Sequence, residues 1–450
     1  MYAESHATCT GGTPQPSGIL LGVTIAIICI APAVGLCHAA RVAFEPAQSS
    51  VPGSRDTHQA LEIIQRRTGL LEEHLDRLRA IPAHGNRTLH IDQLFIGLLL
   101  AFFDPLARSL RTVADNGNFD GRLDIKRLAR STMSDALAVF DPAHLQPIIN
   151  DLRALVPHLK QTDLDLASIT RRIIAADGTY LTLLSDIAWA LRHTKSDGKT
   201  QCQVRANVQL DTATWTPQVV TISGDDGISE PMSFAPDLLS GVLYVIDRGF
   251  LEFDFIRRLE EKNNQFVLRV RANAPAARVI ETRVLCARDL EQGVIADEMV
   301  QLTGRDAPAG IYRRVTIQTS DRHGKPQLII LLTNLCDTDI AAYVIGAIYR
   351  LRWQIELFFK WLKTWARMDH LLSTSKNGIT FQLYVAVIGV LLMYVQSGRR
   401  VSVYALAALG RLSRGQCTLQ EAMAVIAYRD REREMNNARK ARKRARKKIA

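Results

Sequence analysis

The chain has 450 residues, enough for two or three domains, and 47% of them are apolar, which supports a sizeable core. Its formal net charge is +11, but the twelve residues from Arg439 to Ala450 carry eight Lys or Arg and no acid, so only +3 remains for the rest. The seven cysteines form no C-x-x-C pair, which argues against a disulfide framework or a zinc ribbon and favours a reducing cytoplasm.

An almost continuous apolar stretch, Gly18 to Leu36, stands near the start of the sequence. By length it could span a bilayer or form the core of a signal peptide. No Lys or Arg precedes it, and Pro32 interrupts it. We therefore interpret residues 1–48 as a dispensable extension or as the result of a wrongly assigned start site. A membrane anchor and a signal peptide are the alternatives, and contact with a membrane is not expected.

Helical pattern follows this extension. Apolar residues recur at three- and four-residue steps between Leu61 and Leu78, which indicates the apolar stripe of a helix. The apolar run that ends at Asp104-Pro105 is too short to span a membrane and predicts a buried helix. The sequence thus predicts an all-helical domain over residues 50–165.

The pattern changes at Ile169, where strand-like runs begin. They alternate or are rich in β-branched residues, and one helical run interrupts them, which predicts an α/β core over residues 166–276. Further strand-like runs fill residues 277–336. A long helix is expected from about Asp339 to Arg367, and a second, apolar helix that contains Gln382 and Gln396 is expected to complete the core over residues 337–400.

Residues 401–450 are predicted as a helical segment that ends in the basic tail. A run of like charges of this kind suits contact with a phosphate backbone. A tail that merely keeps the chain soluble is the alternative.

The expected long helix carries four polar residues on one side. Each residue of an α-helix advances by about 100°, so the four fall within an arc of roughly 60°: they are Tyr349, Arg352, Glu356 and Lys363. The opposite side is apolar and is expected to face the core. A solvated stripe with an Arg352–Glu356 pair is the simplest interpretation. A carboxylate flanked by cationic side chains could instead hold a metal while its neighbours hold phosphates.

Such a site needs further carboxylates, and two predicted strand ends supply them. Asp177 precedes Gly178 in "AADGT", and Asp247 stands in "VIDRG". A glycine beside an acid allows backbone or substrate to come close, although an Asp before Gly is more often a turn former. Asp186 is a competitor for the first position, but its surroundings look helical.

The residues Tyr349-x2-Arg352-x3-Glu356-x6-Lys363 match a known signature, Y-x2-R-x3-E-x6-K. The chain resembles the bacterial insertion-sequence DDE transposases that carry it, the YREK group of insertion-sequence family four. "IIAADGTYL" and "LYVIDRGF" resemble the first and second Asp motifs of that family, and the resemblance covers roughly residues 90–400. One departure is Ala175-Ala176, where bulkier apolar residues are commoner.

The resemblance implies a fold of the α/β class. It would be an RNase H-like catalytic core with a β-rich insertion before the last catalytic helix, preceded by the all-helical N-terminal domain. The strand-like runs over residues 277–336 agree with this expectation. So does the separation of 109 residues between Asp247 and Glu356, which is too long for a compact connection.

The resemblance also implies an activity, cut-and-paste DNA transposition. Asp177, Asp247 and Glu356 would be catalytic and would bind two Mg²⁺ ions, for which Mn²⁺ would substitute. One ion would activate the attacking water or DNA hydroxyl, and the other would stabilise the leaving oxygen. Carboxylate oxygens suit Mg²⁺.

The implied partner is double-stranded DNA, both the terminal inverted repeats of the element and the target. Arg352 and Lys363 would grip phosphates, Tyr349 would donate to one, and Arg248 is a further DNA-binding candidate. Trp353 could stack on a displaced base, although core packing is the favoured alternative for it. Residues 50–165 would supply DNA binding, though they contain no evident helix-turn-helix.

Joining two ends implies a homodimer on DNA, and the expected location is the cytoplasm, at the nucleoid. A catalytically inactive descendant that binds DNA as a repressor is the alternative function. A membrane protein is the third.

Overall fold

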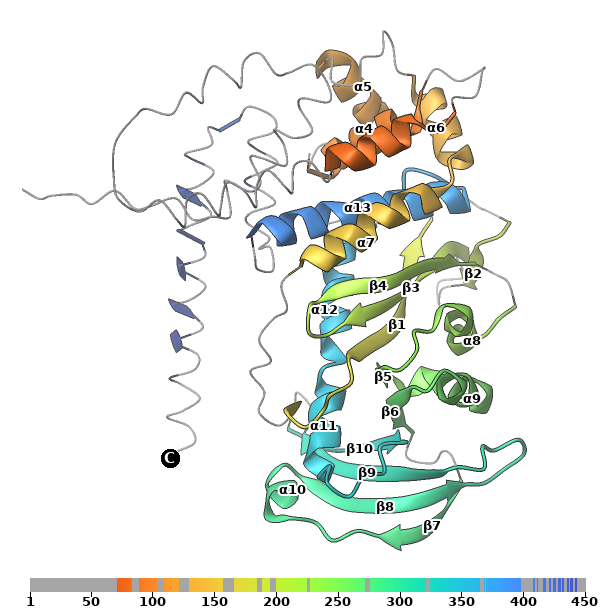
Figure 1. The fold of residues 1–450 in the computed structure, drawn as a ribbon, viewed down its shortest axis with the longest axis vertical. Helices are drawn as coiled ribbons and strands as arrows, with labels where there is room; N and C mark the ends of the chain where they lie inside the picture. The colour runs from red at the N-terminus through yellow and green to blue at the C-terminus, as the bar shows by residue number, and fades with distance from the viewer. Residues whose placement is uncertain are drawn as a thin grey trace, which may run out of the picture. The chain divides into compact units, whose positions relative to one another are not determined.

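The structure is a computed structural model in which residues 71–397 are described apart from short gaps (Figure 1). The gaps are residues 83–88, 104–108, 121–128, 157–165, 184–187, 195–199, 225–226, 272–275, 321–323, 365–367 and 369, and isolated residues between 408 and 442 are also described. The apolar extension over residues 1–48, Asp186 and most of the basic tail lie outside the described residues.

The chain divides into two compact units. One unit is Ser134–Val387, and the other combines Met1–Met133 with Ile388–Ala450. The boundaries fall inside two helices, α6 (Arg130–Val139) and α13 (Lys376–Ser397). Each unit is described by itself.

The unit that combines Met1–Met133 with Ile388–Ala450 contains helices and no strand among its described residues. A helix over residues 71–79 precedes α4 (Ile91–Phe103) and α5 (Leu110–Asp120). Its Arg79 pairs with Asp92 of α4 at 3.2 Å, and His90 contacts the same carboxylate at 2.7 Å. The C-terminal part of α13 approaches α4 closely, because a Cβ added at Gly389 would lie 2.6 Å from the ring of Phe102.

The helix α13 is the apolar helix predicted around Gln382. The side-chain amide of Gln382 accepts from the backbone N–H of Leu372 and donates to the carbonyl of His370, which satisfies a polar group in a largely apolar helix. Across the described part of the chain, no helix combines the length and the apolar character needed to cross a membrane.

The unit Ser134–Val387 is built around one ten-stranded mixed sheet (Figure 1). The strands follow the order β2-β3-β1-β5-β6-β10-β9-β8-β7, and β4 also pairs with β3. Their bounds are β1 (Ile173–Thr182), β2 (Leu191–Thr194), β3 (Thr200–Asp211), β4 (Thr216–Ser223), β5 (Leu243–Ile246), β6 (Gln265–Val270), β7 (Ala277–Thr282), β8 (Val294–Leu302), β9 (Ile311–Ser320) and β10 (Pro326–Thr333). The α/β class predicted from the sequence is confirmed.

The sheet contains both parallel and antiparallel strand pairs. The strands β1, β5 and β6 are parallel neighbours, and every other pair is antiparallel. The strands after residue 277 extend the same sheet, because β10 pairs with β6 in the register Ile330↔Val270. The segment between Asp247 and Glu356 therefore lengthens the sheet at one side.

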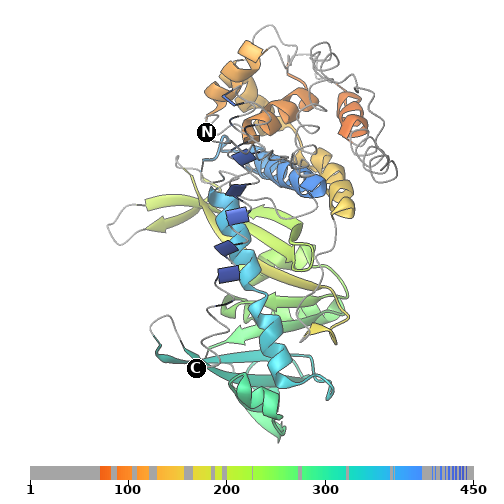
Figure 2. The same ribbon diagram turned by 90° about the vertical axis from the view of Figure 1, so that its left-hand side faces the viewer.

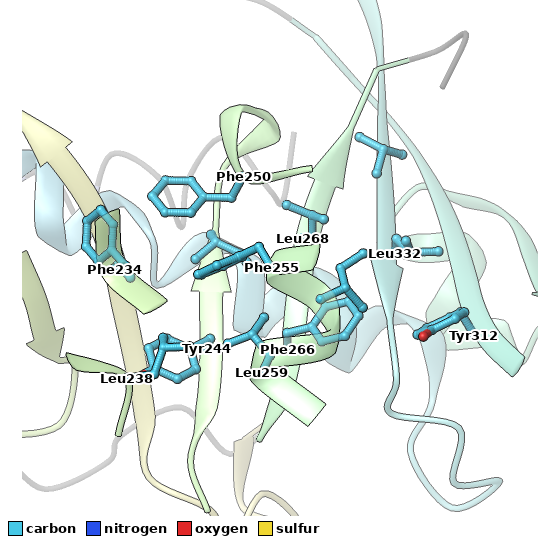
Figure 3. Close-up of a cluster of buried hydrophobic side chains, with 14 of the residues drawn as sticks. Phe234, Leu238, Tyr244, Phe250, Phe255, Leu259, Phe266, Leu268, Tyr312 and Leu332 are labelled. Carbon is cyan, nitrogen blue, oxygen red and sulfur yellow. The ribbon is translucent and has the colours of Figure 1, made fainter. Parts of the chain in front are cut away.

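Both faces of the parallel strands are buried, as is usual for parallel sheets. Helices α8 (Glu230–Phe234) and α9 (Phe253–Glu261) cover one face, over a cluster rich in aromatic residues that includes Tyr244, Phe255 and Phe266 (Figure 3). Alternate strand residues point to the other face, where α11 (Ala342–Arg350) packs (Figure 2). Each fully buried large apolar side chain contributes about 1.5–3 kcal/mol.

The long helix expected from Asp339 to Arg367 is two helices. The first is α11, and the second is α12 (Trp353–Thr364). Between them, Leu351 and Arg352 donate their backbone N–H groups to the carbonyls three residues back, at 3.0 Å each. This tighter 3₁₀-type winding interrupts the α-helix without a proline or glycine.

A second correction concerns Asp177, which was predicted at a strand end with a break at Gly178. The strand β1 continues to Thr182 because its antiparallel pairing with β3 continues through Asp177↔Val208 and Gly178↔Asn207. Only the parallel pairing with β5 ends there, at Ala175↔Val245.

Candidate active site

Two predicted acidic residues occupy matched positions on neighbouring strands. Asp177 lies two residues beyond Ala175 on β1, and Asp247 lies two residues beyond its partner Val245 on β5. Because the strands are parallel, both carboxylates emerge at the same end of the sheet. Both residues are partly buried. The fold thus brings together two acids that are 70 positions apart in the sequence.

Tyr349 connects the second of these acids to α11. Its hydroxyl donates to Oδ1 of Asp247 at 3.1 Å. The helix is held against the sheet by Ile345 and Ile348, which are fully buried. The sequence predicts that Tyr349 donates to a DNA phosphate, whereas in this structure its hydroxyl donates to the carboxylate of Asp247.

Arg352 lies between the other two predicted acids. Its Nη1 is 3.6 Å from Oδ2 of Asp177, and its Nη2 donates to Oε1 of Glu356. The side chain of Arg352 is only 14% exposed. The pair with Glu356 was predicted from the four-residue spacing, and the contact with Asp177 makes it part of a three-residue cluster.

The tight turn between the helices explains why Tyr349 and Arg352 act on neighbouring acids. Side chains three residues apart are eclipsed in 3₁₀-type winding, whereas they are about 60° apart on an α-helix. The guanidinium carbon of Arg352 accordingly lies 5.9 Å from the centroid of the Tyr349 ring. The two side chains therefore reach the carboxyl ends of β5 and β1 side by side.

Burial changes the protonation of the first acid, Asp177. Burial raises the pKa of Asp177 to about 7, with further increases from Glu230 and Asp247, while Arg352 and the backbone N–H of Gly178 oppose the rise. That N–H donates to Oδ1 of Asp177 at 2.9 Å. Ionisation of Asp177 is therefore costly in the protein alone and becomes easier when a cation is nearby.

The nearby carboxylates also change the pKa values of Arg352 and Tyr349. Burial alone would lower the pKa of Arg352, but Tyr349, Asp247 and Glu356 outweigh it and raise the pKa. Burial is the main cause that raises the pKa of Tyr349, and Asp247 adds to it. Both side chains are thus held in their protonated, hydrogen-bond-donating forms.

One acidic residue at the site was missed by the sequence analysis. Glu230, in the first turn of α8, approaches Gly178 from the opposite face of β1. Burial raises the pKa of Glu230, and Asp247 adds to this increase. Arg205 and the backbone N–H of Gly178 oppose it. The only signal in the sequence is the Ser229-Glu230-Pro231 start of a short helix, and this pattern is common at helix N-termini for other reasons.

The remaining predicted site residues lie around this cluster. Arg248 is exposed in the 3₁₀ turn that follows Asp247, and Lys363 lies in the last turn of α12, where burial lowers its pKa. Within the described part of the chain, neither has an ion-pair partner. Trp353 is 54% exposed, so the expectation that it packs in the core is wrong.

The donor chemistry of the site fits a hard divalent cation. Asp177 on β1, Asp247 directly after β5 and Glu356 on α12 supply carboxylate oxygens, which are the ligands such cations prefer. In the described residues, however, no three His, Cys, Asp or Glu side chains converge closely enough to hold a metal ion. Arg352 occupies the position between Asp177 and Glu356, so a bound cation would require this guanidinium to move.

The sequence of this region matches a known family. Residues 168–392, half of the chain, match the family model described as Transposase DDE domain. The match begins just before β1, ends within α13, and contains all of the residues discussed above.

Similar proteins carry transposase names. A protein named as transposase y4zB of Sinorhizobium fredii is 28% identical over 221 residues, which cover 49% of this chain and 59% of the relative. The protein named for insertion sequence element IS4SA of Synechocystis is 24% identical over 68% of this chain and 81% of its own length. The one named for element IS5377 of Geobacillus stearothermophilus is 27% identical over 44% of this chain and 52% of its own length.

The chain thus spans between half and four fifths of the length of these relatives. Among solved structures, the piggyBac transposase in a synaptic complex with hairpin DNA aligns with a TM-score of 0.36 and 11% sequence identity. That alignment covers 81% of this chain and 76% of the other.

Proposed function

This chain belongs to the transposase DDE domain family, and we propose on that basis that it is a DNA transposase. It would cleave DNA strands at the ends of a transposable element and join them to target DNA. One observation carries the proposal: inside the matched residues, Asp177 and Asp247 occupy equivalent positions on adjacent parallel strands, and Arg352 connects Asp177 to Glu356.

The finer assignment of the fold is an RNase H-like core. The order of β4, β3, β1, β5 and β6, with antiparallel strands followed by parallel ones, supports it, as do the helices on both faces. The YREK spacing supports membership of insertion-sequence family four.

Asp177, Asp247 and Glu356 are the residues that would hold Mg²⁺, or Mn²⁺ in its place. When bound, the cation supplies activation of the attacking oxygen and stabilisation of the leaving one. Asp177 would ionise fully as the charge of the cation replaces that of Arg352. Tyr349 would keep the carboxylate of Asp247 oriented through the hydrogen bond of 3.1 Å.

The basic side chains would hold DNA. Once released from Asp177 and Glu356, the guanidinium of Arg352 would be free to bind a phosphate by a bidentate fork. Lys363 lies two helical turns beyond Glu356, roughly 10 Å along the axis, which suits a neighbouring phosphate. Arg248 and the exposed Trp353 flank the same cluster, and Trp353 would stack on an unpaired base.

The substrates would be double-stranded DNA: the terminal inverted repeats of the element and its target. Because two ends must be joined together, the active form would be a homodimer on DNA. The basic tail and residues 50–165, for which the sequence predicts a helical domain, would add contacts to the DNA backbone.

A cleavage assay tests this function. Purified full-length chain is incubated with labelled DNA that carries the inverted repeats flanking its own gene, with Mg²⁺ or with EDTA. We expect Mg²⁺-dependent nicks at the repeat boundaries. Binding to the repeats without any nick in Mg²⁺ or Mn²⁺ would instead identify an inactive, repressor-like descendant.

A further inference from the structure

The strand β7 forms an outer edge of the sheet (Figure 1). It is the last strand in the order β6-β10-β9-β8-β7, and among the described strands it pairs only with β8. Its residues from Arg278 to Thr282 are all exposed. An edge strand presents a row of unpaired backbone N–H and C=O groups, which is a template for pairing with another strand.

The edge also exposes large apolar side chains. Val279 and Ile280 of β7 are 41% and 48% exposed, and Val284, which follows the strand, is 96% exposed. Natural edge strands usually carry charges or proline where pairing must be avoided, whereas here two adjacent β-branched residues occupy the middle of the strand. Contiguous exposed apolar residues indicate an interaction surface. This edge is therefore suited to a partner that supplies both a strand and apolar side chains.

A β-bulge at Ile280 determines which face of the sheet the charged residues of β7 share. On either side of the bulge, the register with β8 is Arg278↔Gln301 and Glu281↔Met299. Alternate residues of a strand point to the same face, so these two partners on β8 share a face. Arg278 and Glu281 consequently share that face too. Without the extra residue, their separation of three positions would place them on opposite faces.

The bulge thereby makes the edge complementary to itself. When two copies of β7 pair antiparallel about a two-fold axis through the bulge, Arg278 of each copy lies opposite Glu281 of the other, on one face. Two opposite-charge pairs then flank a centre made of Val279 and Ile280 from both copies. Opposite charges directly across two strands stabilise their pairing. Among the described residues, Arg278 bonds the neutral side chain of Gln301 at 3.0 Å, and neither charged residue has an ion-pair partner.

We propose that β7 is an interface between two copies of this chain, which pair edge to edge and continue one sheet across both. The partner is a second copy because the charge pattern of the strand matches its own reverse. The interface lies four strands beyond β6 in the sheet order, away from the acids at β1 and β5, and it does not rest on the proposed function. One pair of short strands buries less than the area of a stable interface, about 1,200–2,000 Å², so the association is micromolar or weaker.

The experiment measures self-association of the full-length chain without DNA. Sedimentation velocity over a range of micromolar concentrations gives the Kd of the dimer. We expect Val279→Lys to weaken the dimer by about tenfold or more, because it places two like charges at the centre of the strand pair. Leu328→Lys is the matched control, because Leu328 is similarly exposed, at 52%, but lies on β10, three strands away from β7 in the sheet order. It should leave the Kd unchanged.

Charge reversal tests the register. Arg278→Glu and Glu281→Arg each put like charges opposite each other in both pairs, so each variant alone should associate about tenfold more weakly. An equimolar mixture of the two restores opposite charges in both pairs and should form mixed dimers with the wild-type Kd. The double variant, which combines the two changes and keeps the net charge, should also associate as wild type. Circular dichroism melts establish that each variant is folded.

The results that would overturn the proposal are specific. One is a wild-type chain that stays monomeric at every concentration. Another is a dimer whose Kd is the same in wild type, Val279→Lys and both charge reversals, because its interface would then lie elsewhere. A third is the absence of rescue in both the mixture and the double variant. Since DNA cleavage is not the readout, each of these results leaves the proposed function untouched.

Discussion

The hydroxyl of Tyr349 donates to Oδ1 of Asp247 at 3.1 Å, across 102 residues of sequence. This bond connects the end of a parallel strand to the helix that precedes Glu356. It fixes one carboxylate relative to α11, which leads through the tight turn into α12, the helix that carries Glu356. Tyr349 therefore positions the carboxylate of Asp247, in addition to the phosphate contact that was predicted from the sequence.

Tyr349→Phe should test that role. The ring would still pack against the sheet, while Asp247 would lose its donor. We expect the free energy of unfolding to fall by about 0.5–1.5 kcal/mol, and DNA cleavage to slow while DNA affinity changes little. Tyr343→Phe, on the same helix, is the control, because Tyr343 contacts Arg288 rather than an active-site acid. Equal cleavage rates in both variants would contradict the positioning role.

Glu356→Gln should separate cleavage from binding. The amide keeps the shape of the side chain but removes the charge that would hold the cation. We expect Mg²⁺-dependent nicking to disappear while a gel shift with repeat-end DNA persists. Asp177→Asn and Asp247→Asn should behave alike, because ligands that act as a unit are not additive. The exposed Glu291→Gln serves as the control, and full nicking by Glu356→Gln would remove Glu356 from the site.

Arg352→Ala should reveal that the guanidinium and the cation compete for the same carboxylates. Without Arg352, the charges of Asp177 and Glu356 lose their compensation in the metal-free protein. We expect the Tm measured in EDTA to fall, by an amount equivalent to about 1–3 kcal/mol, and added Mg²⁺ to restore more of it than in wild type. An identical response of both proteins to Mg²⁺ would show that the two cations do not share a position.

Asp177→Asn should stabilise the metal-free protein at high pH. The folded pKa of Asp177, about 7, is raised above its usual value of 3.8, so between these pH values the folded state holds a proton that the unfolded state releases. Stability therefore falls as pH rises from about 4 to 7, and the loss persists above pH 7. The variant avoids this cost, so it should exceed wild type by roughly 2–4 kcal/mol at pH 8 and by little at pH 4. Denaturant titrations in EDTA measure the difference.

Much of the site could be predicted from the sequence because it is encoded in local spacing. The separation of Arg352 from Glu356 specifies an ion pair on one helix face, and Asp247 directly follows a short apolar strand. The α/β class followed from the change of pattern at Ile169. These features depend on residues that are close in sequence.

Features that depend on distant contacts were not predictable in this way. No proline or glycine marks the turn between α11 and α12, so periodicity alone gave one continuous helix. The strand β1 continues past Gly178 because β3 pairs with it. This pairing cannot be inferred from the residues of β1 alone. Glu230 was missed because its carboxylate meets the site only when α8 packs across the sheet.

The strand order has a consequence for the newly made chain. Asp177 and Asp247 precede β7, β8, β9 and β10, and Glu356 follows them. A nascent chain on the ribosome therefore carries both aspartates well before it carries the glutamate. The strands that extend the sheet are therefore made between the two groups of acids, and the proposed catalytic centre is completed only after them, when α12 has been made and can dock on β1.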